Sequence, residues 1–333
     1  MSAKRRIVSV IVTLLIAAYL VLMPEYFAKS IGKDPYKEWF EHKEEPFSGV
    51  IELWHIVGFK PYIGSLGEWL KGRAKRLEKR HFGVYVEVSA MTVEEYRERI
   101  QRNERADIYS FPEGLITDEN LYRLPTDELT CIEYAENCRA AVGRSSDKSV
   151  CYTFSGYMLM LNNDLLNMCP GEPPGEDEKA ADWLRNNAGK IDVAGIRSNS
   201  RIYFLAGSEK AAAELGLGCE CVGYEFFKAN EALCAIADIR ITGDMERISG
   251  SEGRFSVQTY PIGEYTDLYQ YLGIDKEVNE LKLEYIMELI KLITEPDAQA
   301  ALTRIGLFPA IKLEERPTFE SKTVQSLYDA LSE

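Results

Sequence analysis

The sequence predicts an α/β protein in which helices cover a largely parallel sheet. From residue 49 to residue 109, short apolar runs alternate with amphipathic helical patterns. The order is strand, helix, strand, helix, strand, and a helix between two strands normally returns the chain so that the strands lie parallel. About three hundred residues follow the N-terminal segment, which is enough for two lobes that each bury a core.

The first part of the chain has clear signals for both strands and helices. Ser65 with Glu68, and Thr92 with Glu95, have the spacing of a capping box and predict where two helices begin. Valines at every second position from Val84 predict a strand with one buried face. The expected elements are strands at 51–54, 84–88 and 106–109, and helices at 65–80 and 92–100.

The later part of the chain is less regular but still alternates between strands and helices. The segment 168–179 is dense in Pro, Gly and Glu and is expected to be a surface loop. Gly243-Asp244 should end a strand, and Gly306 should end the last helix of this part. The expected elements are strands at 150–154, 157–161 and 233–241, and helices from 162, from 211, at 276–294 and at 297–305.

The N-terminus carries a membrane signal at residues 1–30. A basic cluster, Lys4–Arg6, precedes a mostly apolar run of seventeen residues, Ile7–Met23. This length is short for a spanning helix and long for a signal-peptide core, so an anchor and a cleaved signal both remain possible. We expect a single-pass transmembrane helix with a cytoplasmic N-terminus and an extracellular domain. The alternative is secretion after cleavage near Ala28–Ser30.

Charge and composition exclude some classes of function. The net charge is −14, and phosphate binding needs clustered Lys and Arg, so no nucleic-acid partner is expected. The chain has three histidines, and none lies in a metalloprotease or nucleophile motif. No phosphate-binding glycine loop is present either. We therefore expect neither an enzyme nor a cofactor.

Seven cysteines are present, an odd number for a compartment that permits disulfides. Cys131 and Cys138 flank a short acidic loop, so a disulfide between them is possible. Cys219 and Cys221 are too close in sequence for a relaxed bridge. They also lack the further ligands of a metal site, so no metal is expected.

Several short stretches, in their order and spacing, resemble the extracellular solute-binding proteins of ABC transporters of the maltose-binding type (family 1). The stretches that carry the resemblance are Ile51–His55, Gly83–Val88, Ala106–Ile108, Phe154–Tyr157, Leu161–Leu165, Glu295–Gln299 and Gly306–Pro309. Two features depart from the family. The chain has no lipoprotein cysteine, and the region between Asp164 and Ala211 is short, which points to a smaller second lobe and cleft.

The resemblance implies a periplasmic-binding-protein-like fold, with two α/β lobes joined by hinge crossings that close on a small solute. An ABC permease or membrane sensor subunits would be the partners, and the N-terminal helix would hold the protein at the membrane. The expected division is 1–30 anchor or signal, 31–48 spacer, 49–150 first lobe, 151–258 second lobe, 259–310 first lobe again, and 311–333 on the second lobe.

The same resemblance indicates where a solute would bind. Ligands of open α/β sheets lie at strand ends, and aromatic faces suit sugar rings. The loops after the first and third strands and the two crossings then supply the candidates. These are Trp54, His55, Ser110, Phe111, Glu113, Ser155, Tyr157, Tyr260, Tyr265 and Asp267.

An alternative function is a non-transport envelope scaffold or interaction protein that retains a degenerate binding-protein fold. A short second lobe and an uncleaved anchor favour this alternative, whereas hinge-like segments and the tyrosines favour solute binding. The two hypotheses differ in the cleft. Solute binding expects Trp54, Tyr157 and Tyr265 to converge on one concave space, and a scaffold expects them to be buried apart.

Overall fold

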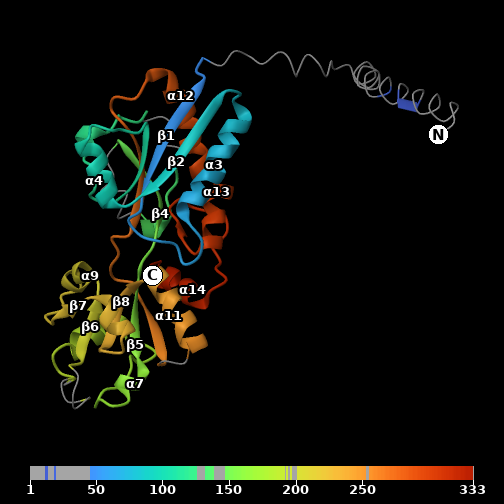
Figure 1. The fold of residues 1–333 in the computed structure, drawn as a ribbon. Coiled ribbons are helices and arrows are strands. Elements are labelled where there is room, and N and C mark those ends of the chain that lie inside the picture. The colour runs from blue at the N-terminus through green and yellow to red at the C-terminus, as the bar shows by residue number, and fades with distance from the viewer. Residues whose placement is uncertain are drawn as a thin grey trace, which may run out of the picture.

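The computed structural model describes residues 46–125, 132–138, 147–191, 201–252 and 255–332, together with residues 12, 13, 19, 193 and 196, and leaves the side chains of 248–252 undescribed. The described chain forms two lobes, one above the other in Figure 1. The first lobe contains a six-stranded sheet and the second lobe a five-stranded sheet. The α/β class and the two-lobed arrangement are as predicted.

The first sheet has the strand order β11-β4-β10-β3-β1-β2. β1 is parallel to β2 and β3, as the alternating pattern predicted, and β10 runs antiparallel between β3 and β4. The strands are β1 Gly49–Ile56, β2 Val84–Met91, β3 Ile108–Pro112, β4 Ser149–Phe154, β10 Tyr269–Ile274 and β11 Phe308–Pro309. The helices of this lobe are α3 Leu66–Arg80, α4 Val93–Gln101, α12 Glu280–Thr294 and α13 Pro296–Ala300, with 3-10 turns η1 Asp118–Asn120, η2 Glu136–Cys138 and η3 Ala301–Ile305.

The predicted helix starts of the first lobe are confirmed in atomic detail. Ser65 Oγ accepts a hydrogen bond from the Glu68 amide at the start of α3. At α4 the capping is reciprocal, because Thr92 Oγ1 accepts from the Glu95 amide and the Glu95 carboxylate accepts from the Thr92 amide. Each cap satisfies amides that have no partner inside the helix.

The second sheet has the order β7-β6-β8-β5-β9. β6 is parallel to β7 and β8, whereas β5 is antiparallel to β8 and β9. The strands are β5 Tyr157–Asn162, β6 Tyr203–Gly207, β7 Cys221–Val222, β8 Ala232–Asp238 and β9 Val257–Ile262, and the helices are α7 Asn163–Leu166, α8 Ala180–Asn187, α9 Glu209–Glu214, α10 Tyr224–Lys228 and α11 Ile239–Glu252.

The expected strand at 233–241 is too long, and Gly243-Asp244 does not end it. β8 stops at Asp238, whose carboxylate accepts a hydrogen bond from the Ile241 amide, and α11 then continues through Gly243. A Cβ at Gly243 would lie 2.5 Å from the Tyr62 ring. The glycine therefore serves a close approach between the lobes rather than a chain reversal.

The expected lobe boundaries at 150/151 and 258/259 both fall inside strands. Residues 149–154 form β4 of the first sheet, and residues 257–262 form β9 of the second. The changes of sheet therefore lie at Ser155–Gly156 and between Ile262 and Tyr269. Each boundary lies a few residues further along the chain than expected, because the residues of one strand stay paired with the same sheet to the end of that strand.

The C-terminal segment does not lie on the second lobe alone. Helix α14 (Lys322–Ala330) contacts β9 of the second lobe, and its buried residues join the first-lobe core, where Tyr328 packs edge-on to Phe308. Figure 1 shows α14 at the level where the lobes meet. Its apolar face is thus shared between the lobes.

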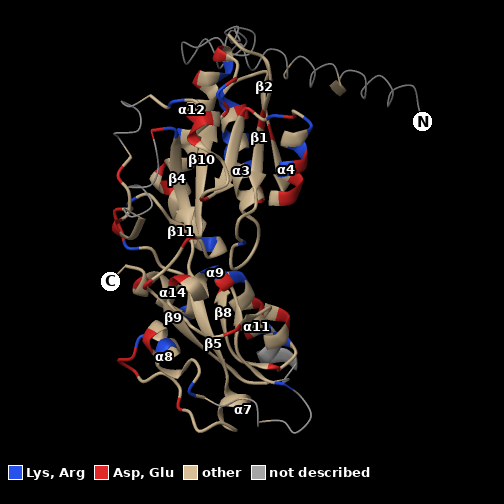
Figure 2. Ribbon diagram, turned by 90° about the vertical axis from the view of Figure 1, so that its left-hand side faces the viewer, with Lys and Arg blue, Asp and Glu red and all other residues tan. Residues whose placement is uncertain are grey.

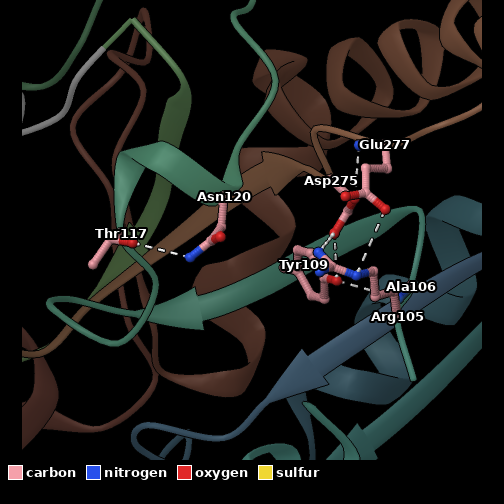
Figure 3. A network of polar contacts seen from close by, with 7 residues as sticks. All are labelled: Arg105, Ala106, Tyr109, Thr117, Asn120, Asp275 and Glu277. Carbon is pink, nitrogen blue, oxygen red and sulfur yellow. Dashed lines mark hydrogen bonds and ion pairs between the residues drawn. The ribbon is translucent and has the colours of Figure 1, made fainter. Parts of the chain in front are cut away.

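Charged residues are spread over the helices of both lobes, with acidic and basic positions interspersed (Figure 2). One buried carboxylate, Asp275, lies just after β10, at the end of that strand away from the hinge (Figure 3). It accepts hydrogen bonds from Tyr109 Oη at 2.8 Å and from the Glu277 amide at 2.8 Å. Arg105 lies beside it. This network ties β3 to β10 and is remote from the crossings.

The expected membrane segment at 1–30 falls outside the described residues apart from positions 12, 13 and 19, as does the spacer 31–48 up to residue 45. Within the part of the chain that is described, no helix has the length and apolar character needed to cross a membrane.

Candidate functional site

Two crossing segments join the lobes and lie side by side. The Ser155 amide donates to the Leu268 carbonyl oxygen at 2.9 Å, and Thr266 Oγ1 donates to the Ser155 carbonyl oxygen at 2.6 Å. One segment leads from β4 into β5, and the other leads from β9 back into β10. Residues next to these bonds therefore face the junction between the lobes.

A cluster of aromatic and charged side chains lies at this junction. Tyr157 and Tyr265 stack with ring centroids 6.1 Å apart and planes 10° from parallel. Tyr157 Oη donates to Asp267 Oδ1 at 2.7 Å, and Lys210 forms an ion pair with the same carboxylate. These four residues, Tyr157, Lys210, Tyr265 and Asp267, are called the hinge cluster below.

Each member of the hinge cluster is positioned by a different element. Tyr157 is the first residue of β5, Lys210 lies in the first turn of α9, and the other two lie on the returning crossing. Burial raises the pKa of Tyr265 to about 12, with the charge of Asp267 adding to it. Burial and the hydrogen bond to Asp267 also raise the pKa of Tyr157. Both phenols are therefore neutral donors at physiological pH.

The loop after β1 makes a second contact between the lobes, on the side of α11. Tyr62 Oη donates to Glu246 Oε2 at 2.9 Å, and Arg240 donates to the Tyr62 carbonyl oxygen at 3.5 Å. Burial raises the pKa of Asp238, and the positive charge of nearby Lys60 acts on this pKa in the opposite direction. First-lobe Lys60 and Tyr62 thus face charged groups of the second lobe.

Four predicted binding residues lie in the first-lobe core instead of in loops. β1 extends to Ile56 and β3 to Pro112, so Trp54, His55, Ser110 and Phe111 are strand residues, and each is buried. Helices cover both faces of this sheet over the last four residues of β1, so these side chains are buried whatever their polarity, whereas Val50 and Glu52 nearer the start of the strand are exposed. The expectation that these residues lie in loops was therefore wrong.

The contacts of these four residues are internal to the first lobe. Trp54 packs edge-on to Tyr109 and lies under Arg99 of α4. Phe111 stacks on Tyr271 of β10 at 6.0 Å. On the other face of the sheet, His55 and Ser110 share a buried hydrogen bond of 2.9 Å.

The other predicted residues lie nearer the crossings. Glu113 follows β3, and its amide donates to the Tyr269 carbonyl oxygen at 3.3 Å. Ser155 is fully buried within the first crossing, and its Oγ has no hydrogen-bond partner among the described residues. Tyr260 was expected on the returning crossing but lies within β9, opposite Leu159, because the strand continues to Ile262, and it is half-buried against the second-lobe core. The structure thus brings together Tyr157, Tyr265 and Asp267.

Sequence reasoning missed Lys210, Lys60, Tyr62 and Glu246. Ser208 caps α9 by accepting a hydrogen bond from the Ala211 amide. A strand predicted at 203–207, with Ser208 as the helix cap after it, would have placed Lys210 in the first turn of a helix. The contact of Tyr62 with Glu246 joins residues 184 positions apart in sequence and carries no local signal.

Two pockets along the C-terminal segment share no lining residue with the hinge cluster. A pocket of about 320 Å³ is lined by residues 134–137, 311–313, 315–317, 328 and 332, and another of about 420 Å³ by residues 296, 297, 300, 303 and 313–318. Over the described ranges, no three His, Cys, Asp or Glu side chains are arranged to hold a metal ion.

Comparison with solved structures shows which fold this is. An ABC substrate-binding protein of Listeria monocytogenes, solved with cycloalternan, superimposes with a TM-score of 0.56 at 12% identity, covering 86% of this chain and 87% of that one. The GacH receptor of Streptomyces glaucescens, solved with acarbose, gives 0.55 at 14% identity over 86% of both chains. The chain has the fold of the ABC substrate-binding proteins.

Proteins of this fold do not share one ligand. Iron-bound HitA of Pseudomonas aeruginosa superimposes with a TM-score of 0.51 at 13% identity, covering 85% of this chain and 97% of that one. No protein-family model matches the sequence, and no curated protein matches it either. At such low identities the likeness establishes the two-lobed fold, while the ligand must be argued from the residues of this chain.

Proposed function

We propose that this chain is an extracytoplasmic solute-binding protein that captures a small solute, of carbohydrate type, between its two lobes. The N-terminal segment would hold it at the membrane as a single-pass anchor, and an ABC importer or a membrane sensor would receive the solute or the signal. The hinge cluster is the observation that carries this proposal, because it is the place where predicted binding residues meet.

The chemistry of the hinge cluster suits a neutral polyol. Tyr265 is half-buried and offers an aromatic face for the apolar face of a sugar ring, and Tyr157, which is 6% exposed, supports it by stacking. Asp267 and Lys210 can accept from and donate to hydroxyl groups. Two of the solved structures with this fold hold oligosaccharide-like ligands, which supports the same class of solute.

A second candidate is an envelope interaction protein. Trp54 is only 3% exposed and lies in the first-lobe core, apart from the tyrosine pair. Trp54, Tyr157 and Tyr265 therefore do not converge on one concave space, as solute binding would favour. The Tyr62–Glu246 hydrogen bond also joins the lobes directly. These two observations favour a scaffold with a fixed arrangement of lobes.

Thermal unfolding of the full-length chain in detergent, against a library of sugars, amino acids and short peptides, tests the proposal. A binding solute raises the unfolding midpoint with concentration. The Tyr265→Ala variant should weaken binding about tenfold or more, since a stacking face on a ring contributes roughly 1.5 kcal/mol. Tyr85→Ala is the matched control, because Tyr85 is exposed on β2.

The outcomes separate the two functions. A rise with sugars that Tyr265→Ala loses and Tyr85→Ala keeps supports solute capture at the hinge cluster. A well-folded protein with no response to any compound supports the scaffold.

A further inference from the structure

Two buried thiols of the first lobe lie next to each other. Cys138 ends η2 and Cys151 lies in β4, both are fully buried, and their Sγ atoms are 3.6 Å apart. The pair lies in the first-lobe core. Cys131, which the sequence indicated as a possible partner of Cys138, lies outside the described residues.

Independent backbone contacts hold each sulfur in place. The segment before Cys138 is bound to the C-terminal strand region, because the Ala135 amide donates to the Ala310 carbonyl oxygen and the Lys312 amide to that of Glu133. Cys151 is fixed by strand pairing with Tyr271. The two sulfurs are therefore close because two separately anchored parts of the fold meet, and not because a short stretch of chain connects the cysteines.

We propose that Cys138 and Cys151 form an intrachain disulfide in the mature protein. An S–S bond is about 2.05 Å long, so the two sulfurs, now 3.6 Å apart, must approach by roughly 1.5 Å. In forming the bond, each thiol loses a proton, and the two electrons reduce the disulfide of a thiol–disulfide exchange partner to two thiols. The bond would fasten η2 to the strand that leads into the hinge crossing.

The bond must form before the core is complete. Burial raises the pKa of the Cys151 thiol well above its usual range, and only the thiolate attacks a disulfide. Both sulfurs are closed to an external oxidant once packed. The proposal goes beyond solute binding and needs oxidising conditions during folding, which an extracytoplasmic location would provide.

Refolding the full-length chain in detergent with oxidised and reduced glutathione tests this inference directly. After alkylation in denaturant, which exposes every free thiol, and proteolysis, mass spectrometry should find the peptides of Cys138 and Cys151 linked, with a mass lower by two hydrogen atoms than the reduced pair. Protein refolded in dithiothreitol instead should unfold at a midpoint several degrees lower, because it lacks the cross-link that restricts the unfolded chain. Neither readout depends on a ligand, so failure here leaves the proposed function untouched.

Variants assign the bond. In Cys151→Ser, Cys138 should become alkylated and the effect of dithiothreitol should vanish. Cys234→Ala is the matched control, since Cys234 is equally buried in the second lobe and its Sγ donates a hydrogen bond to the Phe204 carbonyl oxygen. This variant should retain the link between Cys138 and Cys151. A Cys131–Cys138 link, or alkylated Cys138 and Cys151 in the refolded unmutated protein, would overturn the inference.

Discussion

His55 is a buried polar residue whose role only its neighbours reveal. Its Nδ1 lies 2.9 Å from Ser110 Oγ, which is also 2.9 Å from Tyr152 Oη and 3.0 Å from Gln270 Nε2. Burial lowers the pKa of His55 from 6.5 to about 4. The imidazole is therefore neutral at physiological pH and completes a core network. Such a network specifies packing between strands rather than contact with a solute.

This lowered pKa predicts acid sensitivity. Above pH 6.5 His55 is neutral in both states and adds no pH dependence; below it the unfolded chain binds a proton that the folded core refuses, so stability falls until about pH 4. A shift of this size corresponds to about 3 kcal/mol. Urea unfolding at pH 7 and pH 4 should show that His55→Gln loses less stability than the unmutated chain by about this amount. Equal losses would refute the prediction.

At the scale of elements, the turn from β6 into α9 delivers Lys210 to the hinge cluster. Gly207 has φ +118°, and a Cβ there would lie 2.0 Å from the Ile236 carbonyl oxygen of β8. Only glycine fits such a backbone and such an approach. Ser208 then caps α9, which sets the position of Lys210 beside Asp267.

Replacing this glycine should break the turn. Gly207→Ala should cost about 3 kcal/mol or more, from backbone strain and overpacking together. The measurement is the urea midpoint of unfolding. Gly218→Ala is the control, because a Cβ at Gly218 meets nothing within 4 Å, and it should leave the midpoint nearly unchanged. A midpoint equal in both variants would contradict the role assigned to Gly207.

At the scale of the whole molecule, the arrangement of lobes depends on contacts between distant segments. Glu246 of α11 accepts from Tyr62 of the first lobe and from Thr323 of α14. α14 also closes over the first crossing, where a Cβ on Gly156 would lie 2.8 Å from Leu331. The first lobe, the second lobe and the C-terminal helix therefore meet at one carboxylate.

Removing that carboxylate should loosen the lobes. Glu246→Ala leaves Tyr62 Oη and Thr323 Oγ1 without this acceptor, so open arrangements become more populated. Small-angle X-ray scattering should then report a larger radius of gyration than for the unmutated chain. Glu225→Ala removes an exposed carboxylate paired with Lys228 on α10 and should not change the radius. An unchanged radius in both variants would show that the contact does not hold the lobes together.

Much of the fold was predictable because its signals are local. The caps at Ser65 and Thr92 and the parallel pairing of β1 with β2 and β3 follow from residue spacing and element order. Prediction failed where a tertiary contact changed the meaning of a residue. In the sequence Gly243 is typical of the end of a strand, yet it lies inside α11, where the ring of Tyr62 approaches too closely to leave room for a Cβ.

The sequence by itself determined the class of fold and the order of elements from β1 to β3, since these depend on periodicity and capping within a few residues, whereas strands β6, β9 and β10 were not predicted. Tertiary structure alone decided which candidates meet. Trp54 is in the core because helices cover both faces of its sheet, and Tyr157 joins Asp267 across 110 residues. Side chains so far apart in sequence become neighbours only when two sheets are packed and joined at a hinge.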